Sequence, residues 1–106
     1  MMKQNEQITL SGYEAIEILK EIEVILISLH DMGSYYIQKD IREYEKETTR
    51  FIDECKVTQR LAKIRGTLSE KFDNTLGDDD MDDLERVMER LKYWKKPGDN
   101  LGDFVE

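Results

Sequence analysis

The sequence predicts an all-α protein: a small antiparallel bundle of three main helices around one long central helix, with a short fourth helix as an alternative. A stripe of mostly apolar residues runs from Ile37 to Leu76 at alternate spacings of four and three, which keeps it on one side of a helix. Residues that favour helix, mainly Glu, Lys, Leu and Arg, fill the middle of the chain. The 106 residues include one proline and six glycines, too few turn signals for an all-β chain.

The first helix is expected over residues 12–32. Ser11 and Glu14 have the spacing of a capping box, in which the serine oxygen accepts from a free backbone amide and the glutamate reaches back to the cap. Apolar residues then form one broad face: Ala15, Ile18, Leu19, Ile22, Ile25, Leu26 and Leu29. Val24 and Ile27 widen it, so we expect this helix to be covered on more than one side, with a second protein chain as one source of cover.

Gly33 and Ser34 are expected to end this helix, and the central helix is expected to begin near Tyr35. Two endings of the central helix stay open. A basic last turn and a glycine stop at Gly66, followed by a fresh capping box over residues 67–70, indicate a break. Alternatively, the helix tolerates this glycine at a cost of about 1 kcal/mol and continues. The cap signals favour a break or kink at Gly66.

A last helix is expected over residues 79–96. Asp78 to Asp83 put negative charge at its N-terminus, and Lys95 and Lys96 put positive charge at its C-terminus, which suits the helix dipole at both ends. Pro97 ends the helix.

The predicted organisation is a flexible N-terminus over residues 1–10, a single helical domain over residues 11–97 and an acidic flexible tail over residues 98–106. The strongest apolar run covers residues 22–29, far below the ~20 residues of a membrane-spanning helix. The start of the chain is polar, and Cys55 is the only cysteine, which excludes an internal disulfide. We therefore expect a cytoplasmic protein with no membrane contact.

The formal net charge of −8 favours a basic protein as partner and disfavours nucleic acid. The candidate partner-binding residues form an acidic patch: Asp78, Asp79, Asp80, Asp82, Asp83 and Glu85. Acidic residues at a helix start also serve the helix dipole and solvation, which is the alternative reading of this patch. Tyr35 and Tyr36 are candidate interface aromatics, with core packing as their alternative.

The acidic residues are poor candidates for a metal site. An EF-hand loop beginning at Asp78 would need glycine at its sixth position, where the chain has Asp83. The pairs Glu14/Glu17 and Glu70/Asp73 lie one helical turn apart and are the candidate magnesium ligands. With His30 as the only histidine, a di-iron bundle is excluded in its usual form. No catalytic residue, cofactor or metal is predicted.

These observations predict a non-enzymatic acidic helical protein that binds a basic protein partner. Immunity proteins, antitoxins, phage-encoded inhibitors and chaperones share this size and character, and the comparison rests on composition alone. A self-assembling scaffold, in the form of a homodimer, is the first alternative. A magnesium-dependent helical nucleotide hydrolase is the second.

Overall fold

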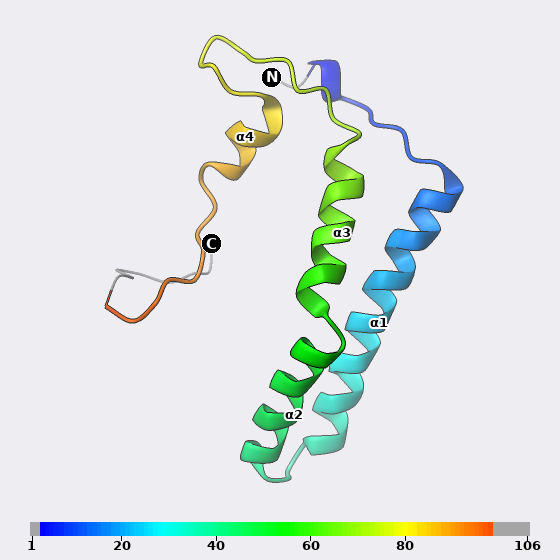
Figure 1. Cartoon of the computed structure of the whole chain (residues 1–106), viewed down its shortest axis with the longest axis vertical. Helices are drawn as coiled ribbons and strands as arrows, with labels where there is room; N and C mark the ends of the chain where they lie inside the picture. Colours follow the sequence, from blue (N-terminus) through cyan, green and yellow to red (C-terminus); the bar gives the residue numbers. More distant parts are fainter. Residues whose placement is uncertain (1–2, 99–106) are drawn as a thin grey trace. The chain divides into compact units, whose positions relative to one another are not determined.

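The computed structural model describes residues 3–98, and within them the regular structure is entirely helical (Figure 1). A 3-10 turn, Lys3–Asn5, precedes four α-helices: α1 (Gly12–Tyr36), α2 (Ile41–Glu54), α3 (Val57–Ser69) and α4 (Asp83–Met88). The first three α-helices all pack against one another, which confirms the predicted all-α class and its three main helices. The described residues form two compact units, residues 9–71 and residues 3–8 with 72–98. The single domain over residues 11–97 stays a prediction.

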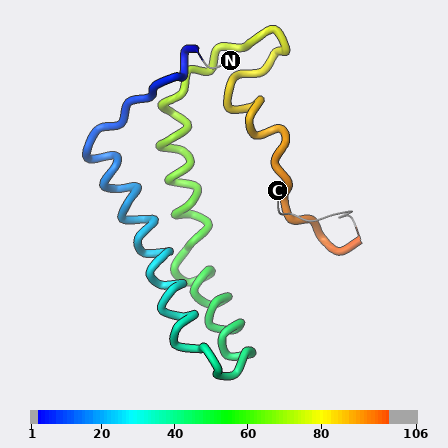
Figure 2. The backbone as a smooth tube through the Cα atoms, turned by 180° about the vertical axis from the view of Figure 1, so that it is seen from behind, coloured from blue at the N-terminus to red at the C-terminus, as the bar shows by residue number. Residues whose placement is uncertain are grey.

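The unit of residues 9–71, here called the three-helix unit, is a helical hairpin. Helix α1 runs one way, and α2 and α3 return beside it one after the other (Figures 1 and 2). At 1.5 Å per residue, α1 spans about 37 Å and α2 with α3 about 40 Å, so the two sides match in length.

Helix α1 begins as predicted and ends later than predicted. The Ser11 hydroxyl accepts from the Glu14 amide at 3.1 Å, and the Glu14 carboxylate accepts from the Ser11 amide at 3.0 Å. The predicted end at residues 33–34 is wrong, because the helix continues to Tyr36 and thereby brings the Tyr36 ring to 6.1 Å from that of Tyr44. Gln38, at a φ of 63°, makes the turn instead. Helix α2 accordingly starts at residue 41, not near 35.

The central helix is broken, but not at Gly66. Lys56 has left-handed backbone angles (φ 56°, ψ 49°) and separates α2 from α3, whereas α3 runs through Gly66. The predicted break at Gly66 and the capping box over residues 67–70 are therefore wrong. The Arg60 guanidinium supports the actual break: Nε donates to the Cys55 carbonyl and Nη1 to the Glu21 carboxylate of α1, both at 2.8 Å. The Arg60 side chain thus donates to a carbonyl that the break leaves without a helical partner, and it links the break to α1.

The three-helix unit has almost no enclosed interior. Among residues 3–98, Val57 is the one hydrophobic residue that is buried, at 9% exposure. The side of α1 that faces α2 and α3 is half-buried at Ile18, Ile25 and Met32. A hairpin two helices wide can cover only one side of each helix, so the other apolar side chains of α1 stay in contact with solvent.

The second unit holds the shortest helix. Helix α4 covers residues 83–88, so the predicted helix over 79–96 is wrong in extent. Its N-cap is Asp82, and the aspartates before it form a turn in which the Gly77 amide donates to the Met81 carbonyl at 2.8 Å. Residues 3–5, predicted to belong to a flexible N-terminus, form the 3-10 turn and bury Asn5. Residues 99–106 of the predicted acidic tail lie outside the described residues.

None of the helices in the described range combines the length and apolarity that crossing a membrane requires.

Candidate interaction surfaces

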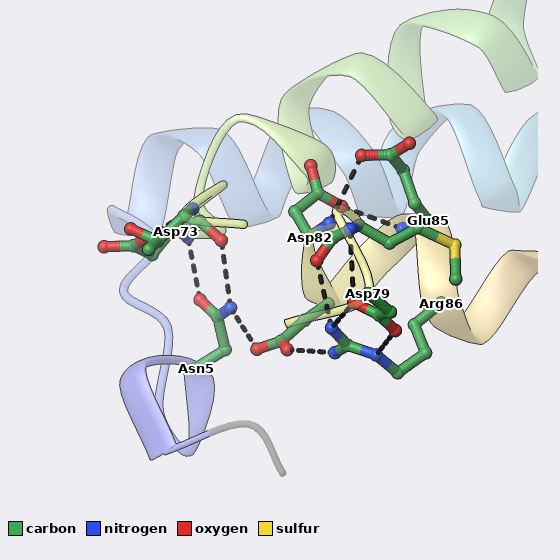
Figure 3. Close-up of polar contacts among 9 residues, drawn as sticks. Asn5, Asp73, Asp79, Asp82, Glu85 and Arg86 are labelled. Carbon is green, nitrogen blue, oxygen red and sulfur yellow. Dashed lines mark hydrogen bonds and ion pairs between the residues drawn. The ribbon is translucent and has the colours of Figure 1, made fainter. Parts of the chain in front are cut away.

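Four of the six residues of the predicted acidic patch bind partners inside their own unit. The Arg86 guanidinium donates to Asp79 through Nε and Nη2, and to Asp83 through Nη1, each at 2.8 Å (Figure 3). Nη2 also donates to the Met81 carbonyl at 2.9 Å. Asp82 and Glu85 form the capping box of α4. The charge at this helix start therefore holds the turn together.

Asn5 completes the same arrangement from the other end of the sequence. Its amide nitrogen donates to Asp83 at 2.8 Å and to the Asp73 carbonyl at 3.1 Å, and its oxygen accepts from the Asp73 amide at 2.7 Å (Figure 3). Asn5 and Asp83 are 5% and 4% exposed. We call these residues, Asn5, Asp73, Asp79, Asp83 and Arg86, the Arg86 cluster. Asp83 is thus a buried carboxylate whose two oxygens are both satisfied.

Gly77 lets the turn pass close to the cluster. A Cβ atom at this position would lie 2.6 Å from Nη2 of Arg86. The guanidinium cannot move aside without losing hydrogen bonds to Asp79 and Met81. The turn therefore requires a residue without a side chain here.

The two remaining residues of the predicted patch, Asp78 and Asp80, are exposed. Within residues 3–98 neither carboxylate takes part in a hydrogen bond or an ion pair. Sequence reasoning missed Asn5 and Arg86. The three-residue spacing of Asp83 and Arg86 could have revealed the arginine, but nothing local points to an asparagine 78 residues away.

The Arg86 cluster shifts the acid–base behaviour of its members. Two hydrogen bonds from Arg86 hold the pKa of the Asp79 carboxyl well below its usual range, and the same contact raises the pKa of Arg86. Because the folded state favours the charged carboxylate, its contribution to stability is complete above the ordinary aspartate pKa of about 4 and is lost as the pH falls below it.

We therefore expect the unit that holds α4 to open at acid pH. Amide exchange at residues 77–89 should become faster as the pH is lowered from about 5 to 3, after correction for the intrinsic exchange rate. Asp79→Asn should remove most of this pH dependence and leave exchange fast throughout. Asp78→Asn is the matched control, since Asp78 lies outside the cluster, and should keep the wild-type profile. If Asp79→Asn kept the wild-type pH dependence of amide exchange, the contact between Asp79 and Arg86 would not be its cause.

The predicted interface aromatics lie at the closed end of the hairpin. Tyr36 packs edge-on against Tyr35, with ring centroids 4.9 Å apart, and desolvation raises the pKa of its hydroxyl. Tyr35 is exposed and carries the Lys39 ammonium 3.6 Å above its ring. Tyr36 therefore contributes to packing, while a role for Tyr35 in an interface stays a prediction.

An apolar surface lies on the three-helix unit and was not selected as a site from the sequence. Seven aliphatic side chains, each 40 to 61% exposed, contribute to it: Leu19, Ile22, Leu26, Leu29, Ile41, Ile52 and Leu61. We call this surface the open face. Ile18 and Ile25 of α1 point inward, and Leu19 and Leu26 follow them by one residue, a turn of about 100° around the helix. Likewise Ile52 follows the half-buried Phe51.

The exposed residues of α1 and of α2 and α3 lie on the same side of the hairpin. Seen from one end of the hairpin, moving one residue forward turns clockwise around α1 and anticlockwise around its antiparallel neighbours, α2 and α3. The inward residues of α1 point toward those of α2 and α3. The residues that follow the inward positions therefore lie on the same face of the hairpin in all three helices. Leu61 follows Arg60, which reaches α1, and so joins this face from α3.

The residues that precede the inward positions form a charged face on the other side. Lys20 pairs with Glu17 at 3.2 Å on α1, and Arg50 pairs with Glu47 at 2.7 Å and with Glu54 at 3.2 Å on α2. The side that carries these ion pairs also holds two exposed aliphatic side chains of α1, Val24 and Ile27, so the open face holds most but not all of the exposed aliphatic side chains of the hairpin.

Three of the four candidate magnesium ligands, Glu14, Glu17 and Asp73, have other partners. Lys71 donates to Glu14 and lowers the pKa of its carboxyl, Lys20 pairs with Glu17, and Asp73 accepts from the Thr75 amide at 2.8 Å. In the described part of the chain, no three His, Cys, Asp or Glu side chains are grouped to share a metal ion. Comparison with protein-family models, with curated proteins and with solved structures finds no match for this chain.

Proposed function

We propose that this chain is a non-enzymatic protein-interaction subunit that binds other protein by packing its open face against it. The observation that carries the proposal is the concentration of seven half-exposed aliphatic side chains on one side of the three-helix unit. Scattered single apolar side chains are normal on a protein surface, whereas a group of them on one side of a molecule marks an interaction site.

The poor interior of the unit supports the same proposal. Within residues 3–98 only Val57 is a buried hydrophobic residue, so the gain from apolar burial is small. Small domains with such a core commonly gain stability by association. A protein surface over the open face would bury the second side of α1, as its breadth of apolar residues requires.

A basic partner stays a prediction. Asp78 and Asp80 are the carboxylates of the predicted patch that remain for it, because the other four act within the fold. They would act by steering a basic surface toward the chain.

Site-specific photo-cross-linking in the native host tests the proposal. A benzoylphenylalanine placed at Leu26 should form a covalent adduct with protein, since this side chain is at the middle of the open face. Val24, on the same helix and 38% exposed, precedes an inward residue and so lies on the charged face; it is the control and should give little adduct. Absence of any protein adduct at Leu26, Leu19 and Leu61 would overturn the proposal.

A further inference from the structure

We infer that the open face is covered by a second copy of this chain, so that two three-helix units pack face to face around a twofold axis. The inference rests on the proposed function and names the partner. A helix in a four-helix bundle touches two neighbours and needs two apolar stripes about a quarter-turn apart. Helix α1 has both: an inward stripe through Ile18 and Ile25, and an exposed one through Leu19 and Leu26.

The exposed stripe of α1 is nearly symmetric about Leu26. It runs through Leu19, Ile22, Leu26, Leu29 and Gly33, so that equal steps before and after Leu26 meet the ends of the stripe. An antiparallel twofold pairing of α1 with α1 of the second copy, centred on Leu26, would place Leu26 opposite Leu26, Ile22 beside Leu29 and Leu19 over Gly33, which leaves room for it. A face that complements itself in this way is what an isologous dimer needs.

The alignment of α1 with α2 and α3 places the twofold axis that passes through Leu26 at the junction between α2 and α3. Contacts between Glu21 and Arg60 and between Tyr36 and Tyr44 fix α1 against its neighbours, and in that register Leu26 lies level with Cys55. Glu45 lies ten residues before Cys55, and Arg65 lies ten residues after it. Each follows an inward-facing residue, which places it at the rim of the open face. A twofold axis at Cys55 would bring Glu45 of each copy beside Arg65 of the other.

The charges support this arrangement. Glu45 and Arg65 are exposed, and neither has an ion-pair partner within residues 3–98. Residues 9–71 carry 12 acidic against 10 basic side chains, so two copies of this unit meet with little net repulsion although the whole chain is at −8.

The extent of the open face also suits a second copy. The face extends along the full hairpin, from Leu19 and Leu61 to Leu29 and Ile41, and a second hairpin has the same length.

Light scattering coupled to size-exclusion chromatography, followed by sedimentation equilibrium, tests the inference with the full chain. We expect a dimer at micromolar concentration. Leu26→Glu should weaken dimerisation about 100-fold or more, because a carboxylate would be buried in the interface. Val24→Glu, on the charged face, should leave it unchanged. Leu61→Glu on α3 repeats the test on another helix, and circular dichroism identifies any variant that fails to fold.

A charge exchange tests the second copy and its orientation. Glu45→Arg should weaken the dimer roughly tenfold by placing it beside Arg65 of the other copy. Adding Arg65→Glu should restore the affinity, which a merely structural role of either residue would not predict. A double variant as weak as Glu45→Arg alone would overturn this axis.

The outcomes separate the two proposals. A wild-type chain that stays monomeric at roughly 100 µM overturns the second copy. If the Leu26 cross-link in the host then joins a different protein, the interaction function stands with another partner. If the chain is monomeric and no cross-link forms, both proposals fail. A dimer that persists in Leu26→Glu and Leu61→Glu places the interface elsewhere and overturns the inference.

Discussion

Replacing Asn5 with alanine should open residues 73–89 while the three-helix unit stays folded. The side chain makes three hydrogen bonds, two to the backbone of Asp73 and one to the buried carboxylate of Asp83. Alanine leaves the buried Asp83 carboxylate and two part-buried backbone groups of Asp73 without these bonds, and an unpaired buried polar group costs about 1–3 kcal/mol. We expect a loss of about 2–4 kcal/mol in the local stability of this unit, most of what so small a structure can have.

Hydrogen exchange resolved by residue measures this effect, because a global melting curve would mainly report α1, α2 and α3. Protection at the amides of Asp73, Gly77 and Arg86 should fall by more than about tenfold, and protection in α1 should not change. Gln4→Ala, an exposed substitution in the same 3-10 turn, is the control. Equal protection in Asn5→Ala and wild type would show that the asparagine does not hold this segment.

The second large effect is expected at Arg60. Arg60→Ala removes the donor to the Cys55 carbonyl at the break and leaves Glu21, whose side chain is 16% exposed, without its ion-pair partner. We expect the three-helix unit to lose about 2–3 kcal/mol, because both acceptors are partly withdrawn from water. Arg60→Lys should recover only part of this loss, since one ammonium does not span the two acceptors as a guanidinium does.

Urea unfolding followed by circular dichroism checks the Arg60 prediction, with protein concentration held fixed. Lys63→Ala, an exposed cation on the same helix, is the matched control and should cost little. In a double-mutant cycle with Glu21→Gln, the coupling should be clearly favourable. Additive effects of the two substitutions would mean that the Glu21 contact contributes nothing and that the carbonyl contact alone matters.

Local signals in the sequence were sufficient for the class and for the start of α1, where the predicted capping box at Ser11 is present. Apolar spacing identified the stripe that α2 and α3 share. The break at Lys56 could not be predicted, because the flanking residues include no glycine, proline or asparagine. It is stabilised by Arg60 and by a contact with Glu21, 39 residues earlier in the chain. At Gly33 the opposite occurred: a glycine suggested an end, and packing of Tyr36 against Tyr44 extended the helix.

The same distinction between local and tertiary signals applies to the candidate surfaces. The acidic residues were found at once, since they are adjacent in the sequence, but their bonding to Arg86 and Asn5 depends on tertiary structure. Sequence reasoning predicted cover on more than one side of the first helix. It did not identify the open face as a surface, because that requires knowing which side of α1 meets α2 and α3.

The left-handed residue at Lys56 has a further consequence for the alignment of the stripe. Residues repeated every 3.5 positions drift by about 20° per heptad around a regular helix, so a continuous helix over residues 41–69 would carry the stripe progressively away from α1 unless the two coiled around each other. The interruption lets α3 start in a new rotational setting. Insertion or deletion of one residue at this joint would turn all of α3 by about 100° and move Leu61 out of line with Ile52.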